Sequence, residues 1–233
     1  MKKKTDLTYE AIKERIISGE YPPMSELTED ALQQEFKCSR TPVREAFIKL
    51  AENGFINIYV GKATLVSPIS QELIEEIYEI RVLLEPHIAI RASEFIPEDL
   101  LKDLRIKFTN PPEFESNSDR RSYFINCDGL LHTSLLNYCG NSFMIKAMKL
   151  IYEHNERFRN FSSNPSSDGS INEHLAIIDS LISRDTQKIE QSVLNHIKAS
   201  KNISINAYLN KTRELNANKA LEKYTISKHK LLS

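Results

Sequence analysis

The sequence predicts a mostly α-helical protein with one short β-hairpin near its N-terminus. Apolar residues recur at helical spacing through most of the 233-residue chain, which has only 6 glycines and 9 prolines. Runs that favour strands are confined to residues 55–67. The stretch from Ser39 to Arg44 places a hydroxyl residue and two arginines before an apolar helical run. A helix with a basic first turn and apolar later turns is typical of helices that read DNA.

Composition describes an ordinary globular chain. Hydrophobic residues make up 40% of the sequence and charged residues 27%. No run approaches the roughly 20 apolar residues that a membrane helix needs. The basic N-terminus has no apolar run after it, so we expect that it does not act as a signal peptide. Three cysteines lack metal-ligand spacing and fit free thiols in a reducing compartment. We therefore expect a cytoplasmic protein without membrane contact.

The first 68 residues predict a winged helix-turn-helix, which consists of three helices and a hairpin. Amphipathic periodicity, turn residues and helix stop signals set the limits of each element. The expected helices cover residues 7–18, about 28–36, and 39 or 40 to 53, and the expected strands cover 55–59 and 63–66.

Local charge favours DNA as a partner of this part, although the whole chain has a net charge of only −1. Between Lys37 and Lys62 five basic residues stand against two acidic ones, which gives a net charge of +3. Arginine has forked donors that match guanine O6 and N7. The residues expected to contact double-stranded DNA are Ser39, Arg40, Thr41 and Arg44 on the third helix and Gly61 and Lys62 at the wing tip.

Residues 69–233 predict a second, all-helical domain. Pro68 closes the wing, and Ser70 can cap a long helix that runs past Leu84. The domain boundary is therefore placed between residues 68 and 69. The tail from Lys211 is charged and weakly amphipathic, so its pattern fits either a last helix or partial disorder. Further helices are expected over residues 97–108, 120–139, 141–160, 170–183 and 186–209, with loops over 109–119 and 162–169.

Four side chains on three of these helices have metal-ligand chemistry. Asp128 and His132 are four residues apart and share a helix face, while His174 and His196 lie in apolar stretches of two later helices. Imidazole nitrogens with a carboxylate suit zinc, nickel, manganese or iron(II). Spacing alone leaves a second interpretation open, in which the histidines are hydrogen-bonded core residues.

Residues 7–68 resemble the DNA-binding domain of GntR-family transcription regulators. The resemblance rests on residues 39–46 (SRTPVREA), on Leu50 and on residues 54–56 (GFI). The wing tip, residues 61–64 (GKAT), is similar to that of the FadR branch. There are two departures from the family pattern. Ala63 replaces a second wing glycine, and Asp30 stands where relatives often have an arginine that contacts phosphate. An acid at that position implies a smaller or displaced phosphate footprint.

Residues 70–210 resemble the all-helical FCD effector domain of the same branch. The pattern consists of Asp128-x-x-x-His132, Glu173-His174, Arg184-Asp185 and His196. The resemblance implies that the aspartate and the three histidines hold one divalent metal ion per chain at the bottom of a ligand pocket. Zinc is preferred, with nickel or manganese as alternatives.

Arg81 matches the start of the FCD domain, and the resemblance places it near the pocket as an effector anchor. An ion pair with Glu85, one helical turn away, is the alternative role for this arginine.

The leading interpretation is a DNA-binding transcription regulator and not an enzyme. We expect a homodimer on a palindromic operator, controlled by a small-molecule effector, a carboxylate, at the metal-containing pocket. A metal-dependent hydrolase and a regulator that senses only the metal are the alternatives.

Overall fold

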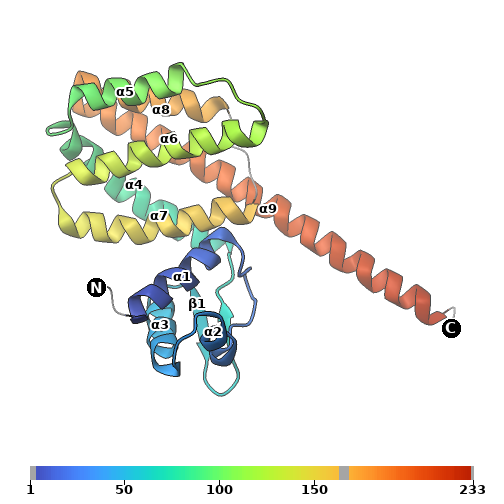
Figure 1. The fold of residues 1–233 in the computed structure, drawn as a ribbon. Helices are drawn as coiled ribbons and strands as arrows, with labels where there is room; N and C mark the ends of the chain where they lie inside the picture. The colour runs from blue at the N-terminus through green and yellow to red at the C-terminus, as the bar shows by residue number, and fades with distance from the viewer. Residues whose placement is uncertain (1–3, 163–167, 232–233) are drawn as a thin grey trace. The chain divides into compact units, whose positions relative to one another are not determined.

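The structure, a computed structural model, describes residues 4–162 and 168–231 (Figure 1). Its elements confirm the predicted class, mostly helical with a two-stranded antiparallel hairpin. In chain order they are α1 (Lys4–Ser18), α2 (Glu29–Glu35), α3 (Arg40–Glu52), β1 (Ile56–Tyr59), β2 (Ala63–Val66), α4 (Gln71–Ser93), α5 (Glu98–Thr109), α6 (Asn117–Tyr138), α7 (Ser142–Ser162), α8 (Asp168–Ser183) and α9 (Thr186–Leu231).

The structure can be compared with the expectation for the C-terminal tail, but only in part with that for the loop over 162–169. The loop expected over 162–169 falls mostly on residues 163–167, which lie outside the described residues. The tail continues α9 without a break to Leu231, so of the two interpretations the helical one holds.

The chain divides into two compact units. Unit 1 contains residues 1–74 and 152–163, and unit 2 contains residues 75–151 and 164–233. The second half of α7 thus packs with the N-terminal elements. There His154 stacks on Phe55 with 4.4 Å between ring centroids, and Arg157 donates a hydrogen bond to the carbonyl of Ser67. The division into functional domains at residues 68 and 69 stays a prediction.

Unit 1 is a winged helix-turn-helix. Helix α3 packs against α1, α2 and β1, and its apolar positions Val43, Ala46 and Leu50 are fully buried. Strands β1 and β2 pair from Ile56↔Val66 to Tyr59↔Ala63. The turn between them needs the positive φ of 71° that Gly61 adopts without strain. This packing leaves the polar face of α3 and the wing tip exposed.

Unit 2 is a helical bundle. Helix α5 packs on α6 and α8, and α8 packs on α9 (Figure 1). Helix α4 carries exposed apolar side chains, with Leu83 57% and Ile80 37% accessible. Within the described part of the chain, every helix is too short or too polar to cross a bilayer.

Candidate metal centre and nucleic-acid interface

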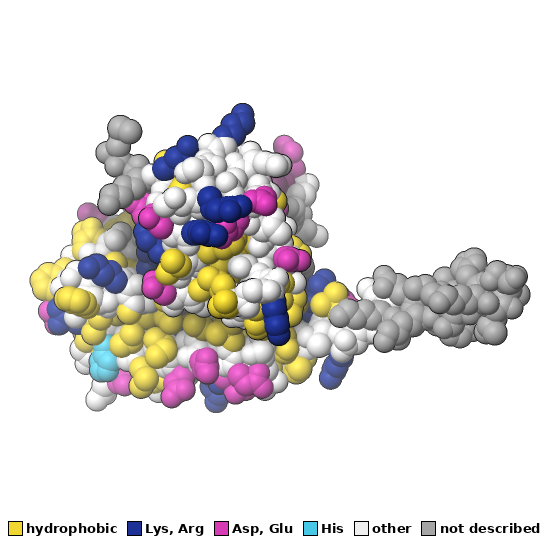
Figure 2. Space-filling view, turned by 90° about the horizontal axis from the view of Figure 1, so that it is seen from below, with side chains coloured by type: hydrophobic (Ala, Val, Ile, Leu, Met, Phe, Trp, Pro, Cys, Tyr) yellow, Lys and Arg dark blue, Asp and Glu magenta, His cyan; other side chains and the backbone are white. Residues whose placement is uncertain are grey.

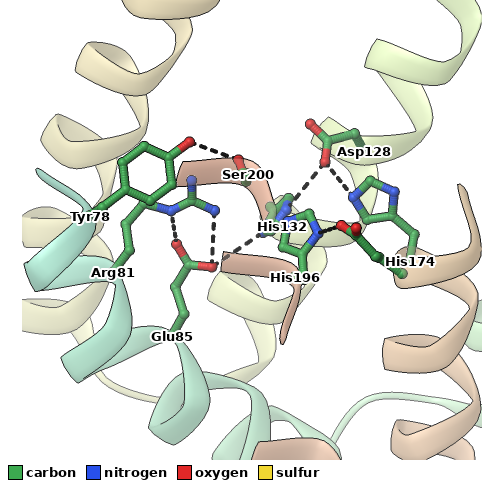
Figure 3. A network of polar contacts seen from close by, with 9 residues as sticks. Tyr78, Arg81, Glu85, Asp128, His132, His174, His196 and Ser200 are labelled. Carbon is green, nitrogen blue, oxygen red and sulfur yellow. Dashed lines mark hydrogen bonds and ion pairs between the residues drawn. The ribbon is translucent and has the colours of Figure 1, made fainter. Parts of the chain in front are cut away.

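The four predicted ligands come together inside unit 2 (Figure 3). Helix α6 supplies Asp128 and His132 from successive turns, α8 supplies His174, and α9 supplies His196. One candidate ligand atom from each residue lies within 4.8 Å of the other three. A single ion can therefore contact all four side chains after small adjustments.

The contacts around His174 fit coordination of a cation better than a complete hydrogen-bond network. Its Nε2 lies 2.8 Å from Asp128 Oδ1, and His132 Nε2 lies 3.3 Å from the same oxygen. Yet both ring nitrogens of His174 are buried and neither makes a hydrogen bond. Close approach without hydrogen-bond alignment is expected when lone pairs are directed at a common centre. The residues present therefore fit a divalent metal.

His196 is held in a neutral form that suits a ligand. Burial lowers the pKa of His196 from 6.5 to about 4, although the neighbouring Glu173 opposes that shift. Glu173 Oε2 lies 3.2 Å from His196 Nδ1. A carboxylate accepts hydrogen bonds, so we assign the ring proton to Nδ1, which leaves the lone pair on Nε2 for a metal.

Asp128 supplies the negative charge of the cluster. Burial by itself raises the pKa of this carboxyl, but the adjacent His132 and His174 lower it, and the net pKa lies well below its usual range. The carboxylate is therefore ionised at neutral pH, which gives a donor set of one anion and three imidazoles. Such a set is suited to zinc and to other first-row divalent metals.

Arg81 lies beside this cluster and is already paired. Its Nε lies 2.5 Å from Glu85 Oε1, and both side chains are almost fully buried. Glu85 Oε2 is in turn 3.9 Å from His132 Nδ1, so the ion pair reaches the candidate metal ligands (Figure 3). The guanidinium also stacks over the ring of Tyr78 at 4.7 Å. The structure thus contains the ion pair that the sequence offered as the alternative role of Arg81.

The residues predicted to contact DNA lie on the surface of unit 1. Ser39 occupies the N-cap position of α3 without a capping hydrogen bond from its side chain. At the start of α3 and at the wing tip, the exposed residues include Arg40, Thr41, Arg44, Gly61 and Lys62. Lys and Arg side chains are interspersed with Asp and Glu on the face drawn in Figure 2.

Three acidic partners of the predicted site residues were missed by sequence reasoning. Glu29 and Asp30 of α2 bond to the arginines of α3, and Glu173 bonds to His196. The position of Glu173 directly before His174 was the one available signal. No periodicity links Glu29 or Asp30 to residues ten to fifteen positions later, so only the fold reveals those pairs.

The structure is a helical protein with an N-terminal winged helix-turn-helix, and comparison with known families gives its class. Residues 4–66 match the family described as bacterial regulatory proteins, gntR family, and residues 76–199 match the FCD domain. The chain therefore belongs to the GntR family of transcription regulators and carries an FCD domain.

Individual relatives agree with this assignment. The HTH-type transcriptional repressor RspR of Escherichia coli K12 is 27% identical over 193 residues, which cover 82% of this chain and 84% of the repressor. The gluconate operon transcriptional repressor of Bacillus subtilis is 37% identical over 90 residues, which cover 39% of this chain and 37% of that protein. The structure of E. coli McbR/YncC superposes with a TM-score of 0.70 at 18% identity, covers 89% of this chain and 100% of its own, and shows the same fold.

The metal-free protein should lose stability as the pH falls from about 6.5 to about 4. Within that window His196 takes up a proton in the unfolded chain but not in the folded one, so stability rises with pH. The shift from 6.5 to about 4 corresponds to at most about 3 kcal/mol. Urea denaturation of chelated protein across this range measures it.

His196→Gln should flatten the pH dependence, while His87→Gln, at an exposed position on α4, should leave it unchanged. Equal pH dependence in the wild type and His196→Gln would contradict the assignment.

Proposed function

We propose that this GntR-family regulator changes its operator affinity when a small organic acid binds a metal-containing pocket in its FCD domain. Residues 1–68 form the DNA-binding domain of this proposal, and residues 69–233 form the effector-binding and dimerisation domain. The observation that carries the proposal is the convergence of Asp128, His132, His174 and His196 in the interior of unit 2.

One divalent metal ion per chain is the proposed cofactor, with zinc preferred and nickel or manganese as alternatives. The two unsatisfied nitrogens of His174 and the ionised Asp128 support it. When bound, the ion would supply a Lewis-acidic centre with coordination positions left for an oxygen ligand. The chain's own contribution is to orient the imidazoles, as Glu173 does for His196.

The proposed effector is a small carboxylate or hydroxycarboxylate. A carboxylate is a hard oxygen ligand for the metal, and Arg81 lies close enough to the cluster to add a charge-assisted contact. Glu85 holds the guanidinium from the neighbouring helical turn, so it can orient Arg81 for contact with an effector. The carboxylate of Glu85 also disfavours effectors with several negative charges.

DNA reading is assigned to the start of α3 and to the wing. Arg40 and Arg44 are four residues apart and exposed, so both can face a major groove. Ser39 and Thr41 are placed to contact phosphates or bases, and Gly61 and Lys62 to enter the adjacent minor groove. Because DNA is the target, the proposed site of action is the cytoplasm.

A homodimer on a palindromic operator completes the proposal. Two recognition helices in successive major grooves require two-fold symmetry. The exposed Ile80 and Leu83 of α4 are three residues apart and share a face that a second copy can cover. Helix α4 also follows the wing directly in the chain, so the coupling between effector and DNA is assigned to it, with a typical magnitude of about 1–3 kcal/mol.

The hydrolase alternative has less support. The relatives reported above are named as transcriptional regulators. The two further carboxylates beside the cluster, Glu85 and Glu173, are engaged with Arg81 and His196. A general base needs a carboxylate that is directed at a water molecule.

Arg44→Ala should keep the fold but lose discrimination between operator and random DNA by about 1–3 kcal/mol. The forked base contact is lost while the apolar face of α3 stays intact. Fluorescence anisotropy with a duplex selected from a random pool by the wild-type protein measures the loss.

Lys49→Ala is the matched control for Arg44→Ala, because it removes the same charge from the last turn of α3. Equal discrimination in Arg44→Ala and the wild type would contradict the DNA assignment.

His174→Ala should lower metal affinity by more than about tenfold and reduce the melting temperature of the metal-loaded protein. One of four ligands is removed, and the remaining three are less able to join α6, α8 and α9. Elemental analysis of the purified variant checks this. His87→Ala should retain the wild-type metal content, and full occupancy in His174→Ala would rule the site out.

An organic acid that acts as effector should raise the melting temperature in the presence of metal and fail to do so after chelation. A panel of central-metabolism and sugar acids, tested by thermal shift, provides the search. Arg81→Lys should weaken the shift, because lysine keeps the charge beside the buried Glu85 but lacks the fork. If a ligand causes the same thermal shift after chelation and in Arg81→Lys, neither the metal nor Arg81 binds it, which contradicts the proposed effector site.

A third outcome concerns the metal alone. If chelation changes the affinity for the operator when no organic acid is present, the alternative in which the regulator senses only the metal is favoured.

A further inference from the structure

Four charged side chains at the starts of α2 and α3 form one connected row. Asp30 Oδ1 accepts a hydrogen bond from Arg40 Nη2 at 2.9 Å, and Glu29 Oε2 lies 3.1 Å from Arg40 Nε. Glu29 Oε1 also accepts from Arg44 Nε at 2.7 Å. The row therefore alternates acid, arginine, acid, arginine. Its formal charges cancel, although the arginines belong to the stretch with a local net charge of +3.

Exposure indicates that this row contributes little to folding. The side chains of Arg40, Arg44 and Asp30 are 55%, 61% and 76% accessible, and Glu29, which lies between the two arginines, is 27% accessible. Ion pairs between solvated side chains are weak and are easily exchanged for other partners. Acids in the first turn of α2 also interact favourably with the helix dipole. Glu29 and Asp30 can interact with the helix dipole without contacting Arg40 and Arg44, the two side chains of α3 that are proposed to bind DNA.

The chemistry of the row distinguishes two kinds of DNA contact. A phosphate that approaches Arg40 also approaches Asp30, only one hydrogen bond away, so the two anions repel each other. A guanine edge is a neutral acceptor and brings no such repulsion. Because a guanidinium has five N–H donors, Arg40 can bind a base with one edge while an acid holds another. The row therefore opposes phosphate contact and permits base contact.

Building on the proposed DNA contacts of α3, we propose that Asp30 is a specificity-determining residue that acts through Arg40. Asp30 keeps Arg40 from binding phosphates of any sequence and leaves it available to a base edge. Glu29, which contacts both arginines, positions them relative to each other. The protein then gains specificity by weak binding to random DNA rather than by stronger binding to its operator.

Asp30→Asn tests this because it removes the charge and keeps the size of the side chain. The probes are a random-sequence duplex and the duplex selected from a random pool by the wild-type protein, each titrated between about 50 and 200 mM salt. Affinity for the random duplex should rise at least about threefold at the lowest salt, and the slope of log K against log salt should steepen by about one. Affinity for the selected duplex should change less, so the ratio of the two falls.

Asp6→Asn is the matched control. Asp6 pairs with Lys49 at 2.7 Å, so its removal makes the same change in net charge and also releases a cation of α3. It should leave both the salt slope and the affinity ratio as in the wild type. Equal changes in Asp6→Asn and Asp30→Asn would show that only net charge matters, which overturns the proposal.

The double variant Asp30→Asn/Arg40→Ala separates action through Arg40 from a structural effect. Compared with Arg40→Ala alone, it should show no further change in the salt slope. A full effect of Asp30→Asn in that background would overturn the proposal.

The same measurements distinguish a wrong role for Asp30 from a wrong assignment of Arg40 and Arg44 to DNA. If Arg40→Ala and Arg44→Ala both bind the selected duplex normally, the DNA assignment itself is wrong. If they lose binding while Asp30→Asn behaves as the wild type, only the role of Asp30 is wrong.

Discussion

The carboxylate of Asp128, whose side chain is 15% accessible, is the constraint on which the interior of unit 2 depends. It is ionised at neutral pH, and an ionised carboxylate inside a protein needs a compensating partner. Its neighbours are imidazoles, of which His196 is held neutral by burial and His174 has two nitrogens without hydrogen bonds. A divalent cation would satisfy the carboxylate and these nitrogens together. The four side chains come from α6, α8 and α9, so binding of a metal would also stabilise the packing of these three helices.

In each unit, one arginine proposed to bind a ligand is already paired with a carboxylate. Arg81 is paired with Glu85 in unit 2, and Arg40 is paired with Asp30 in unit 1. An arginine that already has a carboxylate partner binds a further anion less strongly, since charge repulsion offsets part of the gain. It favours ligands that bring a second contact, such as a metal bond for an effector or a forked base edge for DNA. Selectivity then comes from weakening the contacts that any anion could make.

Helical periodicity and turn residues were sufficient to predict most elements, because amphipathic faces record which side is buried. The convergence of the four candidate ligands was also predictable, since Asp128 and His132 lie one turn apart and the rest follows the FCD pattern. Periodicity does not record contacts between segments far apart in sequence, such as Asp30 with Arg40 or His154 with Phe55. The helical pattern was also weak beyond Lys211, where charged residues interrupt the apolar positions although α9 continues to Leu231.

The central claim is that the four side chains around Asp128 hold a metal ion. The most direct measurement is anomalous X-ray diffraction from crystals of the protein purified without added metal or chelator, with data collected on both sides of the zinc, nickel and manganese absorption edges. The account predicts one anomalous peak per chain, bonded to Asp128, His132, His174 and His196, with His196 Nδ1 still turned to Glu173. Density in which His174 and Asp128 hydrogen-bond directly to each other, with no anomalous peak even after the crystals are soaked in zinc, would contradict it.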